Sequence, residues 1–140
     1  MRTHNKKGQR ISPDVLLARR KGIEEEQKHF DNLEEIIKNP SLIGVNNSTI
    51  ILKETKWYNR SGGTPDLIFT DGFKLYIVEY KLNHSESSEK KAEEQLKTAG
   101  KWFSSRGIER KKLNLLVVYG DPKNKNFEVR YYNLDKQRFY

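Results

Sequence analysis

The chain of 140 residues contains no cysteine and no long apolar segment. Without cysteine it can form neither a disulfide framework nor a zinc site built from thiolates. Its apolar runs fall far short of the ~20 residues that a membrane span requires, and its basic N-terminus lacks the apolar stretch of a secretion signal. These absences predict an intracellular protein with no membrane partner, in the cytoplasm or nucleoid, or in the host cytoplasm if the protein is viral.

Apolar residues are also scarce, at 34% of the chain, whereas charged residues reach 33% and the net charge is +8. Basic residues gather in two segments, and such clusters suit a polyanion, of which nucleic acid is the commonest inside cells. We therefore predict DNA as the partner. The alternative is a solvated surface with a basic tail. The N-terminal cluster comprises Arg2, Lys6, Lys7, Arg10, Arg19, Arg20 and Lys21, and the second comprises Lys101, Arg106, Arg110, Lys111 and Lys112.

The order of patterns along the chain predicts a basic arm over residues 1–11 and a single domain over 12–140. Ser12, Pro13 and Asp14 are typical of a helix start. A mixed central sheet flanked by helices, an α/β fold, accounts for the whole series. The expected elements are a helix to about Lys38 with an interruption at Gly22, a strand at 48–55, a loop at 56–64, a hairpin at 66–81, a helix at 88–105, a strand at 113–119 and a weaker strand at 127–132.

The hairpin places acidic and basic side chains together. With Asp71-Gly72 as a two-residue turn, Asp66 pairs with Ile77. Because strand residues alternate between faces, one face then carries Asp66, Ile77, Glu79 and Lys81. The carboxylates of Asp66 and Glu79 become diagonal neighbours whose Cβ atoms lie about 7–8 Å apart. Buried acids need a partner or a metal ion, and the plainer alternative is an ordinary salt bridge at a strand end.

Each predicted helix directs one polar residue toward this face. At about 100° per residue, Glu26 falls within the apolar stripe of Ile23, Phe30, Leu33 and Ile37. On the second helix, Gln95 falls within the stripe of Ala92, Leu96, Ala99, Trp102 and Phe103. Since buried polar groups require partners, we expect Glu26 and Gln95 to join Asp66, Glu79 and Lys81.

The segments "PD" at 65–66 and "EYK" at 79–81 resemble the signature of the PD-(D/E)XK nuclease superfamily. The resemblance implies a restriction-endonuclease-like αβββαβ core over residues 14–119. It also implies that Asp66 and Glu79 bind a divalent metal, with the main-chain carbonyl of Tyr80, and that Lys81 assists the attacking water. Oxygen ligands of this kind suit Mg²⁺ or Mn²⁺.

Two subfamilies share further features with the chain, and the choice between them is open. The segment "KGIEEE" at 21–26 resembles the start of Holliday-junction resolvases, which selects Glu26 as a further acid near the metal. The segments "GGTPDLIF" and "VEYK" are similar to VRR-type nucleases. A glutamine after the signature is frequent in the superfamily, as Gln95 is here. Ala99 stands where the Gln-x-x-x-Tyr variant of RecB-like exonucleases has tyrosine.

The loop at 56–64 carries Trp57, Tyr58 and Arg60, and it should border the metal site. Aromatic rings beside an arginine can stack on an unpaired base, although they can equally cover a small core. The lysine and arginine residues of the N-terminal arm would contact backbone phosphates, which position DNA without reading its sequence.

Together these features predict a metal-dependent nuclease that hydrolyses DNA phosphodiester bonds as an endonuclease, with structure-specific cleavage as its finer form. The alternatives are a non-catalytic nucleic-acid-binding α/β module and a protein-interaction domain. A homodimer is also expected, because a thin core and exposed aromatic residues near the C-terminus call for a covered surface. These aromatic residues are Phe127, Tyr131, Tyr132, Phe139 and Tyr140.

Overall fold

The computed structural model describes residues 12–46, 50–54 and 65–140. The predicted arm at 1–11 and the whole of the predicted loop at 56–64 lie outside these residues. The described part is an α/β structure in which one six-stranded mixed sheet is accompanied by two long helices. The coarse fold class predicted from the sequence is therefore confirmed.

The first helix, α1, spans Pro13–Lys38 and starts as its sequence predicts. The Ser12 side chain caps it by accepting a hydrogen bond from the backbone N–H of Val15 (3.3 Å), and Pro13 occupies the first turn. The helix continues through Gly22, so the predicted interruption was wrong. It ends before Pro40, which begins a short 3₁₀ helix over Pro40–Ile43.

The second helix, α2, spans Glu86–Ser105 and begins two residues earlier than predicted. Its start is fixed by a capping box, in which the side chains of Ser85 and Ser88 each accept a hydrogen bond from the other residue's backbone N–H. Within the described ranges, neither this helix nor any other is long and apolar enough to cross a membrane.

The sheet has the strand order β1-β2-β3-β4-β5-β6. Only the central pair β3–β4 is parallel, and α2 forms the crossover that joins these two strands. All other neighbours are antiparallel. The strands are β1 (Ile50–Glu54), β2 (Leu67–Thr70), β3 (Leu75–Lys81), β4 (Leu113–Tyr119), β5 (Glu128–Asn133) and β6 (Arg138–Phe139).

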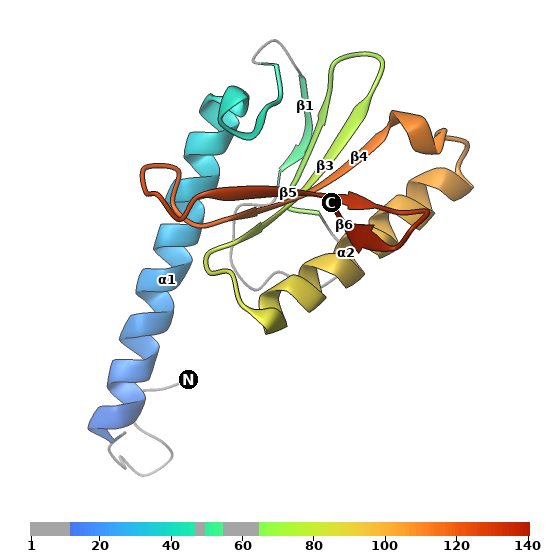
Figure 1. The fold of residues 1–140 in the computed structure, drawn as a ribbon. Helices are drawn as coiled ribbons and strands as arrows, with labels where there is room; N and C mark the ends of the chain where they lie inside the picture. The colour runs from blue at the N-terminus through green and yellow to red at the C-terminus, as the bar shows by residue number, and fades with distance from the viewer. Residues whose placement is uncertain (1–11, 47–49, 55–64) are drawn as a thin grey trace.

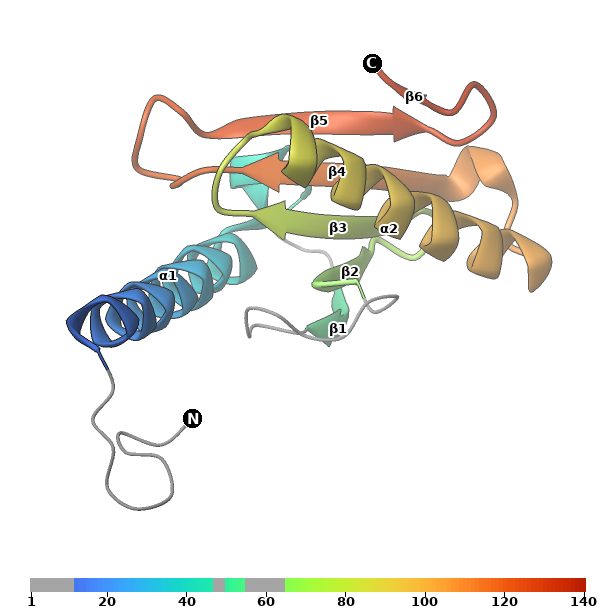
Figure 2. The same cartoon turned by 90° about the horizontal axis from the view of Figure 1, so that it is seen from below.

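The two helices cover opposite faces of the sheet, as Figure 1 and Figure 2 show. Strand alternation determines which side chains meet each helix. One core packs Leu33 and Ile36 of α1 against residues such as Val78 and Tyr80. The other packs Leu96 of α2 and its neighbours against residues such as Ile77 and Val117. Strands β3 and β4 are therefore buried on both faces.

The hairpin of β2 and β3 differs from the prediction in its turn. The connection has four residues, 71–74, and Thr70 pairs with Leu75. Asp71 sets this longer loop, since its Oδ1 accepts hydrogen bonds from the backbone N–H groups of Phe73 (2.8 Å) and Lys74 (2.7 Å). The predicted pairing of Asp66 with Ile77 was therefore wrong by two residues, but a shift of two leaves every side chain on its predicted face.

The apolar stripe predicted for α1 was wrong in its N-terminal half. Ile23 is 67% exposed, because this half of the helix extends past the sheet and has no strand beneath it (Figure 1, Figure 2). The buried residues of α1 are His29, Asn32, Leu33 and Ile36. On α2, Trp102 was expected in the core but is 50% exposed.

The aromatic residues near the C-terminus are mostly not exposed, contrary to expectation. Tyr132 is buried, Phe127, Tyr131 and Phe139 are half-buried, and only Tyr140 lies open to solvent. The unpredicted strand β6 explains this, because it brings the Phe139 ring to 5.0 Å from the Tyr132 ring. Most of these residues therefore extend the core. The homodimer stays a prediction, but exposed aromatic residues no longer support it.

Candidate active site

Two acidic side chains meet where β2 begins and β3 ends. The β2–β3 register pairs Leu67 with Val78, so its continuation by one residue brings Asp66 opposite Glu79. The Oδ2 atom of Asp66 accepts a 2.7 Å hydrogen bond from the backbone N–H of Tyr80, and each of the two carboxyl groups influences the pKa of the other. Glu79 is only 2% exposed. The predicted juxtaposition of Asp66 and Glu79 is thus present.

Burial dominates the electrostatics of this acidic pair. It raises the pKa of the Glu79 carboxyl well above its ordinary value, and the neighbouring Asp66 charge raises it further. Burial likewise raises the pKa of Asp66, opposed by the Tyr80 N–H and by His29 and Lys81. The two carboxylates are therefore costly to ionise together, and a positive charge placed between them would relieve this cost.

Lys81 lies on the same face as Glu79, two residues further along β3. Its Nζ donates a 2.7 Å hydrogen bond to Oε1 of Gln95 on α2. Both side chains are half-buried. The structure therefore brings together four of the five side chains expected at the catalytic site, namely Asp66, Glu79, Lys81 and Gln95.

Tyr80 connects the acidic pair to α1. Its side chain points to the opposite face of the sheet, where its hydroxyl accepts a 2.8 Å hydrogen bond from Nδ2 of Asn32 and donates one to the carbonyl of Gly120. The ring of His29 meets the Tyr80 ring edge-on, with centroids 4.9 Å apart. Sequence reasoning missed Asn32 and His29, although their spacing from Ile36 follows the helical period.

Glu26 forms no hydrogen bond or ion pair with Asp66 or Glu79 in the part of the chain that the structure describes. It is half-buried on α1 and makes no hydrogen bond or ion pair with other residues that the structure describes. The same part of the chain contains no group of three or more His, Cys, Asp or Glu side chains close enough to hold a metal ion. The described donors for a cation are thus the carboxylates of Asp66 and Glu79 and the neighbouring backbone carbonyl of Tyr80.

The predicted nucleic-acid contacts are only partly described. Arg19, Arg20 and Lys21 lie on the half of α1 that extends past the sheet (Figure 1). The others lie outside the described residues. These are Arg2, Lys6, Lys7 and Arg10 of the arm and Trp57, Tyr58 and Arg60 of the loop.

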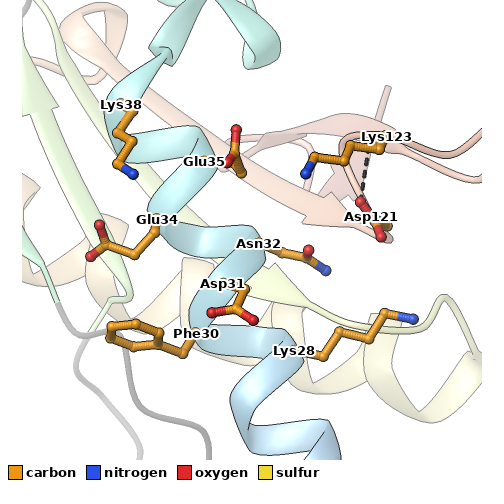
Figure 3. A pocket seen from close by; sticks show the side chains of 9 residues that line it. All are labelled: Lys28, Phe30, Asp31, Asn32, Glu34, Glu35, Lys38, Asp121 and Lys123. Carbon is orange, nitrogen blue, oxygen red and sulfur yellow. Dashed lines mark hydrogen bonds between the residues drawn. The ribbon is translucent and has the colours of Figure 1, made fainter.

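A cleft of ≈ 640 Å³ lies between α1 and the turn that follows β4 (Figure 3). Asp121 in this turn accepts a 2.9 Å hydrogen bond from the backbone N–H of Lys123. Four acidic and three lysine side chains line the cleft, so neither sign of charge dominates it strongly. Asn32 also lines the cleft, and its side-chain amide is hydrogen-bonded to the Tyr80 hydroxyl.

Comparisons of the chain with protein-family models, with curated proteins and with solved structures find no match. The function must therefore be argued from the chemistry and geometry of the site, because a fold class alone does not determine an activity.

Proposed function

We infer that the protein is a metal-dependent nuclease that hydrolyses DNA phosphodiester bonds, and that it acts as an endonuclease. The observation that carries this proposal is the buried Asp66–Glu79 pair with Lys81 two residues away on the same face. Perturbed carboxyl groups beside a lysine at one end of a strand are typical of catalytic sites. The net charge of +8 favours a polyanionic substrate.

The acidic pair fits a divalent cation. Burial raises the pKa of both carboxyl groups, because the surrounding protein does not provide enough hydrogen bonds or positive charge to offset the loss of water around their ionised forms. Asp66, Glu79 and the backbone carbonyl of Tyr80 offer oxygen atoms, which Mg²⁺ and Mn²⁺ prefer, and Glu26 would take part only through water. When bound, such an ion lowers the pKa of a coordinated water and neutralises charge on a phosphate.

Lys81 provides a positively charged side chain of the protein at the proposed site. Its ammonium group is held by Gln95 at 2.7 Å and therefore keeps a defined place beside Glu79. From there it can orient a water molecule and stabilise the negative charge that develops on the scissile phosphate. Direct attack by water on phosphorus yields two cleaved ends without a covalent intermediate.

The order of elements supports a restriction-endonuclease-like core within the α/β fold. Helix α1 is followed by the three strands β1, β2 and β3, then by helix α2 and strand β4, which is the αβββαβ order of the PD-(D/E)XK superfamily. The acid of "EYK" lies on β3, and the acid of "PD" directly precedes the adjacent strand β2. Structure-specific cleavage is the finer form of the proposal.

The test is cleavage of a panel of DNA substrates, comprising duplex, single strand, flap and four-way junction, with and without Mg²⁺ or Mn²⁺. We expect metal-dependent cutting that a chelator stops. Asp66→Asn, Glu79→Gln and Lys81→Ala should each reduce the rate by at least about 100-fold, whereas Glu94→Gln, an exposed acid on α2, should leave it unchanged.

Two results would contradict the proposal. Cutting by Asp66→Asn at the wild-type rate would show that the site is misassigned. Binding of DNA without any metal-dependent cutting would favour the non-catalytic nucleic-acid-binding module instead.

A further inference from the structure

The two flanks of α2 differ in chemistry and in what they face. The buried side of the helix presents Ala92, Leu96, Ala99 and Gly100 to the sheet. One flank faces the strands β4 to β6: Glu89 binds His84 (3.3 Å), and Gly100 lies against Leu134, whose Cδ2 a Cβ at that position would meet at 3.1 Å. This flank is therefore acidic and packed.

The other flank begins at the candidate active site. Its residues recur at intervals of three and four, which aligns them along one side of a helix. They are Lys91, Gln95, Thr98, Trp102 and Arg106, which we call the α2 ridge. Gln95 binds Lys81 of the site. At about 1.5 Å per residue, Trp102 lies about 10 Å further along the helix axis.

The far end of the ridge is an exposed aromatic and basic surface. Trp102 is 50% exposed, its neighbour Phe103 meets it edge-on with ring centroids 4.9 Å apart, and the guanidinium carbon of Arg106 lies 3.7 Å from the indole centroid. The segment 101–112 contains five basic residues and one acidic residue. The indole is thus half exposed to solvent, and the guanidinium group of Arg106 lies over its ring.

We propose that the α2 ridge binds a nucleic-acid strand with unpaired bases, one of which stacks on Trp102 while Arg106 contacts the adjoining phosphate. This inference rests on the proposed function and specifies its substrate. Bases stack on exposed aromatic rings whatever their sequence, and basic side chains follow the backbone. At about 3.4 Å per stacked nucleotide, the ~10 Å from Gln95 to Trp102 corresponds to roughly three nucleotides between the cleavage position and the stacked base.

The partner is a strand with exposed bases because the ridge combines aromatic surface with positive charge. A duplex hides the faces of its bases and would gain only from the charges. A purely electrostatic surface would bind both forms alike and would not need an indole at its end.

The experiment measures binding to the full chain by fluorescence anisotropy, in chelator so that no substrate is cut. The probes are a labelled single strand of about 12 thymidines, an abasic strand of equal length and charge, and a duplex of equal length. We expect the wild type to prefer the thymidine strand to the abasic strand by about tenfold. Trp102→Ala should remove this preference and leave binding of the abasic strand and the duplex within twofold.

Two control variants separate stacking from charge and from general damage. Tyr140→Ala removes another exposed aromatic ring, which lies beside Tyr131 on the opposite face of the sheet, and it should bind all probes as the wild type does. Arg106→Gln should weaken all probes alike and reduce the salt dependence by about one phosphate contact, whereas Lys90→Gln, a matched change on the outer side of α2, should not.

The outcomes distinguish this inference from the proposed function. The proposed binding by the α2 ridge is contradicted if the wild type binds all three probes equally, or if Trp102→Ala keeps the preference for bases. Neither result bears on metal-dependent cleavage. A base preference that depends on Trp102, in a protein that cuts no substrate with metal, supports the ridge and overturns the nuclease.

Discussion

The backbone N–H of Tyr80 donates a 2.7 Å hydrogen bond to Oδ2 of Asp66, from the position between Glu79 and Lys81. The same residue sends its side chain to the other face of the sheet, where its hydroxyl meets Asn32 of α1. One strand residue thus orients the first acid through its main chain and fastens the first helix through its side chain. The acidic pair and α1 are joined by a single residue without an intervening loop.

The first prediction concerns the stability of the Glu79→Gln variant as a function of pH. Glu79 has a folded-state pKa well above its ordinary value of 4.5, so between these two values the folded chain binds more protons than the unfolded chain. Stability that Glu79 contributes below its unfolded pKa is therefore lost as pH rises through the folded pKa. The Glu79→Gln variant has no charge to lose, and we expect it to be more stable than the wild type at pH 8 by about 1 kcal/mol or more, roughly 3–5 °C in Tm.

Thermal melts across the pH range check this prediction. The two proteins should converge at pH 4, where both carry a neutral side chain at position 79. Glu94→Gln, at an exposed position, serves as the control and should follow the wild type at every pH. A higher Tm for the wild type than for Glu79→Gln at pH 8 would contradict the prediction, because it would show that the metal-free protein already stabilises the Glu79 carboxylate.

The second prediction is that Mg²⁺ or Mn²⁺ stabilises the wild type. A cation that binds only the folded state stabilises it by about 2.7 kcal/mol when the cation concentration is 100 times the dissociation constant. This stabilisation raises Tm. We expect this rise at pH 8 for the wild type and its loss in Asp66→Asn and Glu79→Gln. Sodium chloride at equal ionic strength is the control, and an equal rise in all variants would place the cation elsewhere.

The third prediction concerns the Tyr80 hydroxyl. Tyr80→Phe leaves the buried amide of Asn32 and the carbonyl of Gly120 without this partner, which should cost about 1–3 kcal/mol in the free energy of unfolding. The backbone hydrogen bond to Asp66 remains, so metal-dependent cleavage at a temperature where the variant is folded should stay within about threefold of the wild-type rate. Urea denaturation measures the stability, and Tyr140→Phe, at an exposed position, is the matched control. An unchanged stability would contradict the role of this hydroxyl.

The fourth prediction compares two glycines with similar backbone conformations. Gly120 has φ +88°, and a Cβ there would lie 2.6 Å from the backbone oxygen of Asn126. Gly72 has φ +94° with nothing within 4 Å. Both alanine variants share the strain of a positive φ, about 1 kcal/mol, so Gly120→Ala should be less stable than Gly72→Ala by the added cost of the clash, about 1–3 kcal/mol. Equal unfolding midpoints in urea would show that the Asn126 turn moves freely.

The sequence predicts the faces of the hairpin better than its turn. The alternation of β3 placed Glu79 and Lys81 on one face, and the register error at Asp71 did not alter this because it amounted to two residues. The side-chain hydrogen bonds of Asp71 that lengthen the loop depend on local geometry that a two-residue Asp-Gly pattern does not reveal.

For the helices, periodicity alone does not show where the sheet ends beneath them. Ile23 continues the apolar spacing of α1 but lies beyond the strands and is exposed. Asn32 is buried because Tyr80 offers it a hydrogen bond across 48 positions of sequence. No pattern in either segment encodes that pairing, since it arises only when α1 and β3 pack together.

The parallel pairing of β3 and β4 bears on the order in which the site assembles. Asp66 and Glu79 belong to one hairpin, whose short loop closes at little entropic cost. The hydrogen bond from Tyr80 to Gly120 spans 40 positions and requires the α2 crossover to be complete. Contacts of high sequence separation form late when they lie outside the folding nucleus. We therefore expect φ-values to be higher for substitutions within the hairpin than for Tyr80→Phe. A nascent chain would then bring its two acids together before Tyr80 can bond to the turn that follows β4.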